Sequence, residues 1–234
     1  MKALIVYAHE EPRSFNGALL KTAVDTLSEI GMSVTVSDLY AMGFNPVGGK
    51  HDFTTLHEPD YFKYAVEQTH ATSAGTFVPE LAAEHTKLLE ADLLIFQFPL
   101  WWFGLPAILK GWVDRVLAAG LIYGAGKWYS NGEFRNRRAM LCLTTGGPEN
   151  MYTPRGLSGD IDTILYPIQH GMLYFVGYGV LPPMVCWSAT RVSPETRAEY
   201  LAQYRQRLLQ WQTAPIIPFP SLSDYDQSMQ LKQS

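Results

Sequence analysis

Cysteine is scarce in this chain. Its 234 residues include two cysteines, Cys142 and Cys186, which lie far apart in separate apolar runs. No C-x-x-C pair is present, and no cluster of cysteine and histidine has the spacing of a zinc site. The sequence therefore does not support a disulfide-rich secreted fold, and we expect both thiols to be free and buried.

An excess of positive charge and long hydrophobic runs are also missing. The chain has 18 Lys and Arg against 22 Asp and Glu, which gives a net charge of -4 and no basic surface for nucleic acid. The apolar run at residues 3–8 ends at His9 and is too short for a membrane span or a secretory signal. We expect a cytoplasmic protein that does not span the membrane, with this run as its first strand.

Apolar and aromatic side chains are abundant instead. The chain is 47% hydrophobic, which suits one well-packed globular domain. Aromatic residues make up 13% of it and include six tryptophans. Such a surplus is typical of a large core or dimer interface, and equally of a site that stacks planar ligands. Composition leaves both interpretations open.

Short apolar runs alternate with helical patterns along the chain. The predicted strands are residues 3–8, 33–39, 91–98, 139–144 and 180–188, and the predicted helices are 16–30, 79–90, 106–119, 160–176 and 194–211. This order indicates an α/β fold with a doubly wound, flavodoxin-like parallel sheet of five strands and helices on both faces. Ligands of such sheets bind beyond the carboxyl ends of the strands. We therefore look for chemistry in the loops after the first, third and fourth strands.

Two segments fall outside this pattern. Residues 43–78 are polar and form a long connection, which indicates a functional or interaction role. The tail after residue 212 contains Pro215, Pro218 and Pro220, which exclude a regular helix. We therefore predict one domain over residues 1–212 and an extended arm over residues 213–234.

The first of the three loops covers residues 9–16 and leads into a predicted helix. The N-terminus of a helix offers free N–H groups and a positive dipole end to a phosphate. His9, Ser14 and Asn16 can add hydrogen bonds or charge. Because no G-x-G-x-x-G motif is present, a dinucleotide-binding Rossmann fold is disfavoured. An ordinary loop capped by Ser14 or Asn16 explains the same residues, and both interpretations stay open.

The second loop reads FPLWWFGLP over residues 98–106. Adjacent side chains of an extended segment point in opposite directions, so Trp101, Trp102 and Phe103 cannot all enter one core. Some of them must face a cleft or a partner. The segment therefore predicts a wall for a flat ring system, a dimer interface, or both.

The third loop reads TTGGPENMY over residues 144–152. Gly146 and Gly147 allow a ligand to approach the backbone closely, and the hydroxyls of Thr144 and Thr145 can bind the edge of a heterocycle. Because this loop follows a strand of the same parallel sheet, we expect it beside the other two.

These residues carry a resemblance to a known family. The stretches ALIVYAHEEPRSFN, SDLYAMGFNP, ADLLIFQFPLWWFGLPAILKGW, TTGGPENMY and ILYPIQHG span roughly residues 3–220, and they resemble the NAD(P)H:quinone oxidoreductases. This group includes the DT-diaphorases and related bacterial drug-activity-modulator and potassium-efflux ancillary proteins. The resemblance implies a flavodoxin-like homodimer that binds FAD or FMN and uses NAD(P)H as co-substrate.

The resemblance also implies roles for individual residues. The expected cofactor-binding residues are His9, Ser14, Phe15 and Asn16 in the first loop; Pro99, Leu100, Trp101, Trp102 and Phe103 in the second; Thr144, Thr145, Gly146, Gly147 and Tyr152 in the third; and Arg197 near an adenine. Leu121, Ile122 and Tyr123 are expected to border the substrate pocket of the partner chain. We favour FAD over FMN because Arg197 and the 43–78 connection can reach an adenine.

Two positions depart from the mammalian members. Ser158 stands where they have a histidine, and Ala125 where they have a second tyrosine. The first departure puts a proton relay in doubt, and the second suggests a wider pocket. We expect Tyr152 to be the catalytic residue, as a donor toward the flavin N1–O2 edge.

The predicted function is a flavin-dependent NAD(P)H dehydrogenase of quinones. A single aromatic pocket for two planar substrates predicts ping-pong transfer of hydride to the flavin and then of two electrons to a quinone or similar planar acceptor. Two alternatives are a flavin-binding regulatory ancillary subunit of a potassium-efflux transporter and a one-electron carrier of the flavodoxin type. The long connection and the aromatic loop argue against the carrier, which needs neither.

Overall fold

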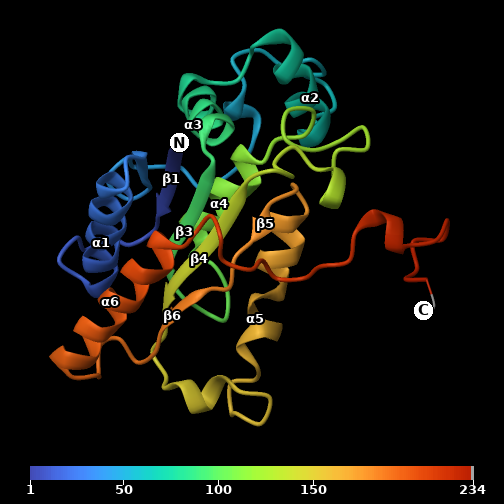
Figure 1. Ribbon diagram of the computed structural model, residues 1–234. Coiled ribbons are helices and arrows are strands. Elements are labelled where there is room, and N and C mark those ends of the chain that lie inside the picture. Colours follow the sequence, from blue (N-terminus) through green and yellow to red (C-terminus); the bar gives the residue numbers. More distant parts are fainter. Residues whose placement is uncertain (233–234) are drawn as a thin grey trace.

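A computed structural model describes residues 1–232, and its centre is a parallel sheet in the order β2-β1-β3-β4-β5 (Figure 1). A sixth strand, β6, pairs with β4 on the same side as β5. The strand bounds are β1 Lys2–Tyr7, β2 Ser33–Asp38, β3 Leu93–Pro99, β4 Arg138–Thr144, β5 Gly179–Val180 and β6 Met184–Cys186. The predicted flavodoxin-like α/β fold is confirmed.

Helices cover both faces of the sheet. The bounds are α1 Phe15–Glu29, α2 Tyr64–Ala74, α3 Pro79–Glu90, α4 Ala107–Val116, α5 Ile161–Ile168 and α6 Pro194–Leu209. Leucines of α1 and α6 pack on one face, and apolar side chains of α3, α4 and α5 pack on the other. The alternation of side chains along β3 divides them between these two layers, so that Ile95 faces α1 and Phe96 faces α4.

The last predicted strand is interrupted. Residues 180–188 form β5 and β6, separated by Pro182 and Pro183. A proline nitrogen cannot donate to the ladder of a sheet, so the pairing with β4 stops there and resumes at Met184. The predicted helix over 160–176 is likewise divided, because α5 ends at Ile168 and a π-helical segment follows over Gln169–Tyr174.

The 43–78 connection contains structure that the sequence pattern does not reveal. It holds a short 3-10 helix, Lys50–Asp52, and the whole of α2. In Figure 1 this segment lies at the end of the sheet where β1 begins, whereas the loop after β4 lies at the opposite end.

The segment after α6 runs without a regular helix, apart from the 3-10 turn Leu222–Asp224. Leu222 N donates to Ser130 Oγ at 3.0 Å, and the Tyr174 hydroxyl donates to Pro220 O at 2.8 Å. An antiparallel bridge joins Tyr225 to Leu231 at the end of the arm. The boundary at residue 212 stays a prediction, and the last two residues of the predicted arm lie outside the described residues.

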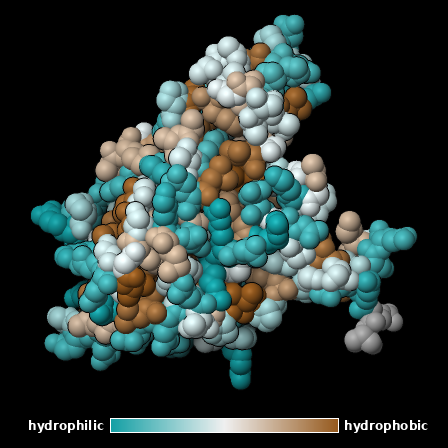
Figure 2. All heavy atoms as spheres, turned by 45° about the horizontal axis from the view of Figure 1, so that its top comes forward, coloured by the Kyte–Doolittle hydropathy of each residue, from teal (hydrophilic) through white to brown (hydrophobic). Residues whose placement is uncertain are grey.

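Cys142 and Cys186 are free and buried, as expected, and burial raises the pKa of both thiols, which keeps them protonated. Within residues 1–232, no helix has the length and apolar character to cross a bilayer, and no three His, Cys, Asp or Glu side chains gather as metal ligands. On the face seen in Figure 2, apolar residues appear in small groups among hydrophilic ones.

Candidate functional site

The three loops meet at Thr144, the last residue of β4. Leu100 N, from the loop after β3, donates to Thr144 O at 2.8 Å. Asn16, in the first turn of α1, donates through Nδ2 to Thr144 Oγ1 at 3.0 Å. The loops after β1, β3 and β4 therefore form one site at the carboxyl edge of the sheet, where the strand order predicts it.

The first loop presents donors suited to an anion. Ser14 caps α1 by accepting from Gly17 N at 3.2 Å, which leaves the N–H groups of Phe15 and Asn16 without intrahelical acceptors. His9 Nδ1 accepts from Glu11 N at 3.1 Å, so a neutral imidazole carries its proton on Nε2. These groups and the dipole of a 15-residue helix favour a bound phosphate.

The side chain of Asn16 is committed inside the protein. It is buried, accepts from Gln97 Nε2 at 3.2 Å through Oδ1, and donates to Thr144. A phosphate contact from this residue is therefore left to its backbone N–H. The first loop is also held close to the helix, because a Cβ on Gly17 would lie 1.9 Å from Pro12 O.

The second loop is a tight turn rather than the extended segment that the sequence suggests. Trp101 and Gly104 exchange two backbone hydrogen bonds of 3.2 and 3.0 Å. Trp102 and Phe103, between them, have φ of 49° and 58°, the left-handed pair of a type I′ turn. For residues with a side chain this conformation costs about 1–2 kcal/mol each. The turn displays both rings, and Trp102 is 97% exposed.

The third loop leaves its glycine amides free. Thr145 uses its hydroxyl internally, donating to Gly147 O at 2.8 Å and accepting from Ser188 N at 3.3 Å. A Cβ on Gly147 would lie 3.1 Å from the Tyr152 ring and from Met151 Sδ, so a larger residue would have to displace these side chains. Gly146 faces open space. Tyr152 therefore lies against the backbone of Gly147, where its hydroxyl can reach a ligand edge.

Several backbone N–H groups of the second and third loops stand without acceptors. Among the described residues, no protein atom accepts from the amides of Trp102, Phe103, Gly146 and Gly147. Exposed aromatic faces and unused donors thus occur together at one edge of the sheet. This arrangement can bind a planar heterocycle by its faces and its polar edge.

The remaining predicted site residues lie outside the three loops, with Arg197 beside the third loop, because Ala189 N donates to Thr145 O at 3.3 Å. Arg197, on α6, donates to Ala189 O at 3.2 Å. Leu121 and Tyr123 follow α4 and lie at its far end from the second loop, and the Tyr123 ring packs on Phe175 with centroids 5.6 Å apart. Ile122 is completely buried in the core, so its side chain supports its neighbours and does not line a pocket.

The sequence reasoning missed two residues of interest. Gln97 is the single polar residue in the strand sequence LLIFQFP of β3, and that exception was the available signal. Phe175 belongs to a cavity of about 380 Å³ between the π-helical segment and the C-terminal arm, which is also lined by Trp128, Tyr129, His170, Tyr174, Pro220, Leu222, Tyr225 and Met229. No motif marks Phe175, because only the tertiary fold brings the arm to it.

Comparison with known proteins gives a consistent result. A family model described as the flavodoxin-like fold matches residues 1–211. The chain is 48% identical over 217 residues to ribosyldihydronicotinamide dehydrogenase [quinone] of Pongo abelii, covering 92% of this chain and 94% of the relative. It is 45% identical over 222 residues to NAD(P)H dehydrogenase [quinone] 1 of Cavia porcellus, covering 94% and 81%.

A solved structure extends the similarity to the whole fold. A Klebsiella pneumoniae protein assigned as a quinone reductase superimposes with a TM-score of 0.96 at 42% identity, covering 99% of this chain and 94% of that one. The regulatory-subunit alternative has no support in these relatives, which are named as dehydrogenases and reductases. The chain belongs to the flavodoxin-like fold family and, within it, to the NAD(P)H quinone oxidoreductases.

Proposed function

We propose that this oxidoreductase holds FAD at the three loops and reduces quinones or similar planar acceptors in a pocket shared between two copies of the chain. The observation that carries the proposal is the set of four unused N–H groups beside the exposed rings of Trp102 and Phe103. A bound flavin would supply the two-electron redox chemistry. The protein supplies orientation, exclusion of water and hydrogen bonds.

The residues fit a flavin by their chemistry. Trp102 and Phe103 offer apolar faces for a three-ring system, and the amides of Gly146 and Gly147 offer donors for its oxygen and nitrogen edge. The first-turn amides of α1 and His9 Nε2 suit a phosphate. Tyr152, which lies against Gly147, would donate from its hydroxyl to the N1–O2 edge of a bound flavin and stabilise negative charge there.

The pocket requires two chains. Helix α4 separates the second loop from Leu121 and Tyr123, and its 10 residues span about 15 Å at 1.5 Å per residue. This separation from the second loop of the same chain favours a contact with the flavin site of a partner. In a homodimer they complete the site of the partner, and the exposed aromatic turn finds a covering surface there.

The expected flavin is FAD, and the expected hydride donor is a reduced nicotinamide. FAD is favoured over FMN because Arg197 and the 43–78 connection offer contacts to an adenine. The relatives are named for dihydronicotinamide riboside and for NAD(P)H, so NADH, NADPH and dihydronicotinamide riboside are the donors to compare. A cytoplasmic location stays a prediction, in keeping with two unpaired thiols.

The test has three measurements on the purified protein. Mass spectrometry of the denatured supernatant identifies the flavin, and light scattering at micromolar concentration gives the oligomeric state, expected to be a dimer. Initial velocities with a reduced nicotinamide and a quinone are expected to give parallel double-reciprocal lines, as one shared pocket requires. A colourless protein that takes up no flavin on reconstitution rules the proposal out, and intersecting lines rule out the shared pocket.

A further inference from the structure

Three buried side chains form a polar chain that leads from the core of the sheet to the site. Gln97 Nε2 donates to Asn16 Oδ1 at 3.2 Å, and Asn16 Nδ2 donates to Thr144 Oγ1 at 3.0 Å. All three residues are buried and lie on the face of the sheet that carries α1. The chain crosses from β3 to α1 to β4, and it ends where the three loops meet.

The direction of these bonds decides what Thr144 offers. Because Gln97 donates to the Asn16 carbonyl oxygen, the Asn16 amide nitrogen faces Thr144 and the Thr144 oxygen is the acceptor. A hydroxyl that accepts in this way keeps its own proton for another partner. Among the described residues, no protein acceptor takes that proton, whereas the hydroxyl of neighbouring Thr145 donates to Gly147 O.

The Gln97 side chain contributes little to the stability of the fold at this position. Its Oε1 is buried with no hydrogen-bond partner in the described part of the chain, and an unpartnered buried acceptor destabilises the fold. The other six residues of β3 are apolar. A glutamine here is therefore better explained by what its Nε2 does to Asn16 than by a contribution to packing.

We propose that Gln97 is a positioning residue for the bound flavin, acting through Asn16 so that the Thr144 hydroxyl donates its proton into the cofactor site. The proposal rests on the proposed function, because it takes a flavin as the ligand that accepts this proton. Gln97 and the Asn16 side chain do not touch the ligand in this scheme. Thr144 contacts it, and the other two fix which way its proton points.

A double-mutant cycle tests this coupling. The apoprotein, stripped of flavin, is titrated with FAD, and quenching of flavin fluorescence gives the dissociation constant. Thr144→Val removes the hydroxyl at nearly constant shape, and Gln97→Met removes the donor. Each is expected to weaken FAD binding by roughly five- to ten-fold, the effect of one neutral hydrogen bond. The double variant is expected to bind as Thr144→Val does, within about two-fold, because the two changes remove one interaction.

Asn16→Asp provides a second test that keeps the shape of the side chain. A carboxylate accepts from both Gln97 and Thr144, which turns the hydroxyl proton inward. It is expected to weaken FAD binding at least as much as Thr144→Val. In the Thr144→Val background the loss of FAD affinity caused by Asn16→Asp is expected to be smaller. An equal loss in that background identifies charge repulsion as its cause and contradicts control of the Thr144 proton by Asn16.

The control separates stability from positioning. Ser37→Ala removes a buried hydroxyl that donates to Glu84 Oε2 at 2.7 Å, on the other face of the sheet. It is expected to lower the melting temperature of the apoprotein and leave FAD affinity unchanged. Gln97→Met is compared in the wild-type and Thr144→Val backgrounds. If it weakens FAD binding equally in both, or in neither, while the wild type binds flavin, the proposal is overturned. A wild type that binds no flavin overturns both proposals.

Discussion

The two ends of the parallel sheet use polar groups in opposite ways. At the carboxyl edge, four backbone N–H groups and the hydroxyls of Thr144 and Tyr152 lie without protein acceptors beside exposed rings. At the opposite end, the buried charged groups that hold the 43–78 connection, Asp52, Glu67 and Arg115, are paired. The comparison indicates that unpaired backbone donors beside exposed rings mark the site and that buried, paired charges support the scaffold.

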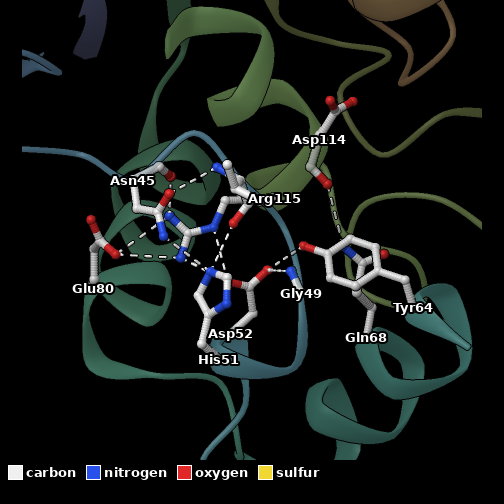
Figure 3. Close-up of polar contacts among 10 residues, drawn as sticks. Asn45, Gly49, His51, Asp52, Tyr64, Gln68, Glu80, Asp114 and Arg115 are labelled. Carbon is white, nitrogen blue, oxygen red and sulfur yellow. Dashed lines mark hydrogen bonds and ion pairs between the residues drawn. The ribbon is translucent and has the colours of Figure 1, made fainter. Parts of the chain in front are cut away.

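Arg115 is the centre of the paired end, and Figure 3 shows its contacts. It is buried, and it donates to Asp52 Oδ1 through Nε at 2.9 Å and Nη2 at 2.7 Å, and to Asn45 O through Nη1 at 2.5 Å. Asp52 also accepts from the Tyr64 hydroxyl and from Gly49 N. Burial and the bond to Asp52 raise the pKa of Tyr64, which therefore stays a donor.

The largest expected effect comes from breaking this pair. Arg115→Met leaves the Asp52 carboxylate buried without its cation, which is expected to lower the free energy of unfolding by about 3–5 kcal/mol. Urea unfolding of the apoprotein measures it. The control is Lys110→Met, which removes an exposed pair with Asp114 of 2.6 Å and is expected to change stability by about 0.5 kcal/mol or less. Comparable effects of the two variants contradict the central role of Arg115.

The next effect is a pH dependence that arises at the paired end. Burial lowers the pKa of His85 to about 4, and its Nε2 has no partner among residues 1–232. Because the unfolded chain binds this proton more readily, the stabilisation is present above about pH 6.5 and is lost as the pH falls toward 4. Wild type and His85→Gln, which does not titrate, are compared by urea unfolding at pH 7 and 4.5. Between pH 7 and 4.5 the free energy of unfolding is expected to fall by about 2–3 kcal/mol more in the wild type than in His85→Gln. Equal decreases contradict the role of His85 in this pH dependence.

The two ends also differ in how far the sequence predicts them. The loops of the site follow from the strand order, because β1, β3 and β4 are apolar runs that are easy to recognise. Helix α2 escapes the same reasoning because its buried residues are Glu67, Gln68 and Ala71, so that it has no apolar stripe. Glu67 is buried to accept the amides of His57 and Glu58 at 2.7 and 2.8 Å, a purpose visible only in three dimensions.

Within the site, residue identity predicts position better than conformation. Trp102 and Phe103 are found in the expected loop, but their left-handed turn depends on the two backbone bonds between Trp101 and Gly104. Asn16 is found at the start of the expected helix, but its side chain points inward because Gln97 and Thr144 lie beneath it. The second difference comes from partners that lie far away in the sequence, whereas the turn forms within the four residues 101–104 and is not marked by the usual Asn-Gly pair.

The donor role of Tyr152 gives the next prediction. If its hydroxyl stabilises charge at the flavin edge, Tyr152→Phe is expected to slow flavin reduction about ten-fold, since a hydrogen bond to a charged group is worth about 1.5–3 kcal/mol. Stopped-flow reduction by the preferred nicotinamide measures the rate. Ser158→Ala is the control and is expected to change it little, and Ser158→His is expected to introduce a pH dependence between about 6 and 8. An unchanged rate in Tyr152→Phe assigns that ring to packing.

The smallest expected effect is a difference in stability between two variants of Trp102. It separates the backbone strain of the aromatic turn from the contribution of the ring to FAD binding. Trp102→Ala and Trp102→Gly both remove the ring, so both are expected to weaken FAD binding, by about ten-fold. They differ in the backbone, because φ of 49° at this position is strained for alanine and free for glycine. The glycine variant is therefore expected to be more stable than the alanine variant by about 1 kcal/mol, less the entropy of its more flexible unfolded chain. Urea unfolding of the two apoproteins measures the difference. If the two variants are equally stable and lose the same affinity for FAD, the turn relaxes when the ring is removed. The left-handed conformation is then maintained by the ring and not by the backbone.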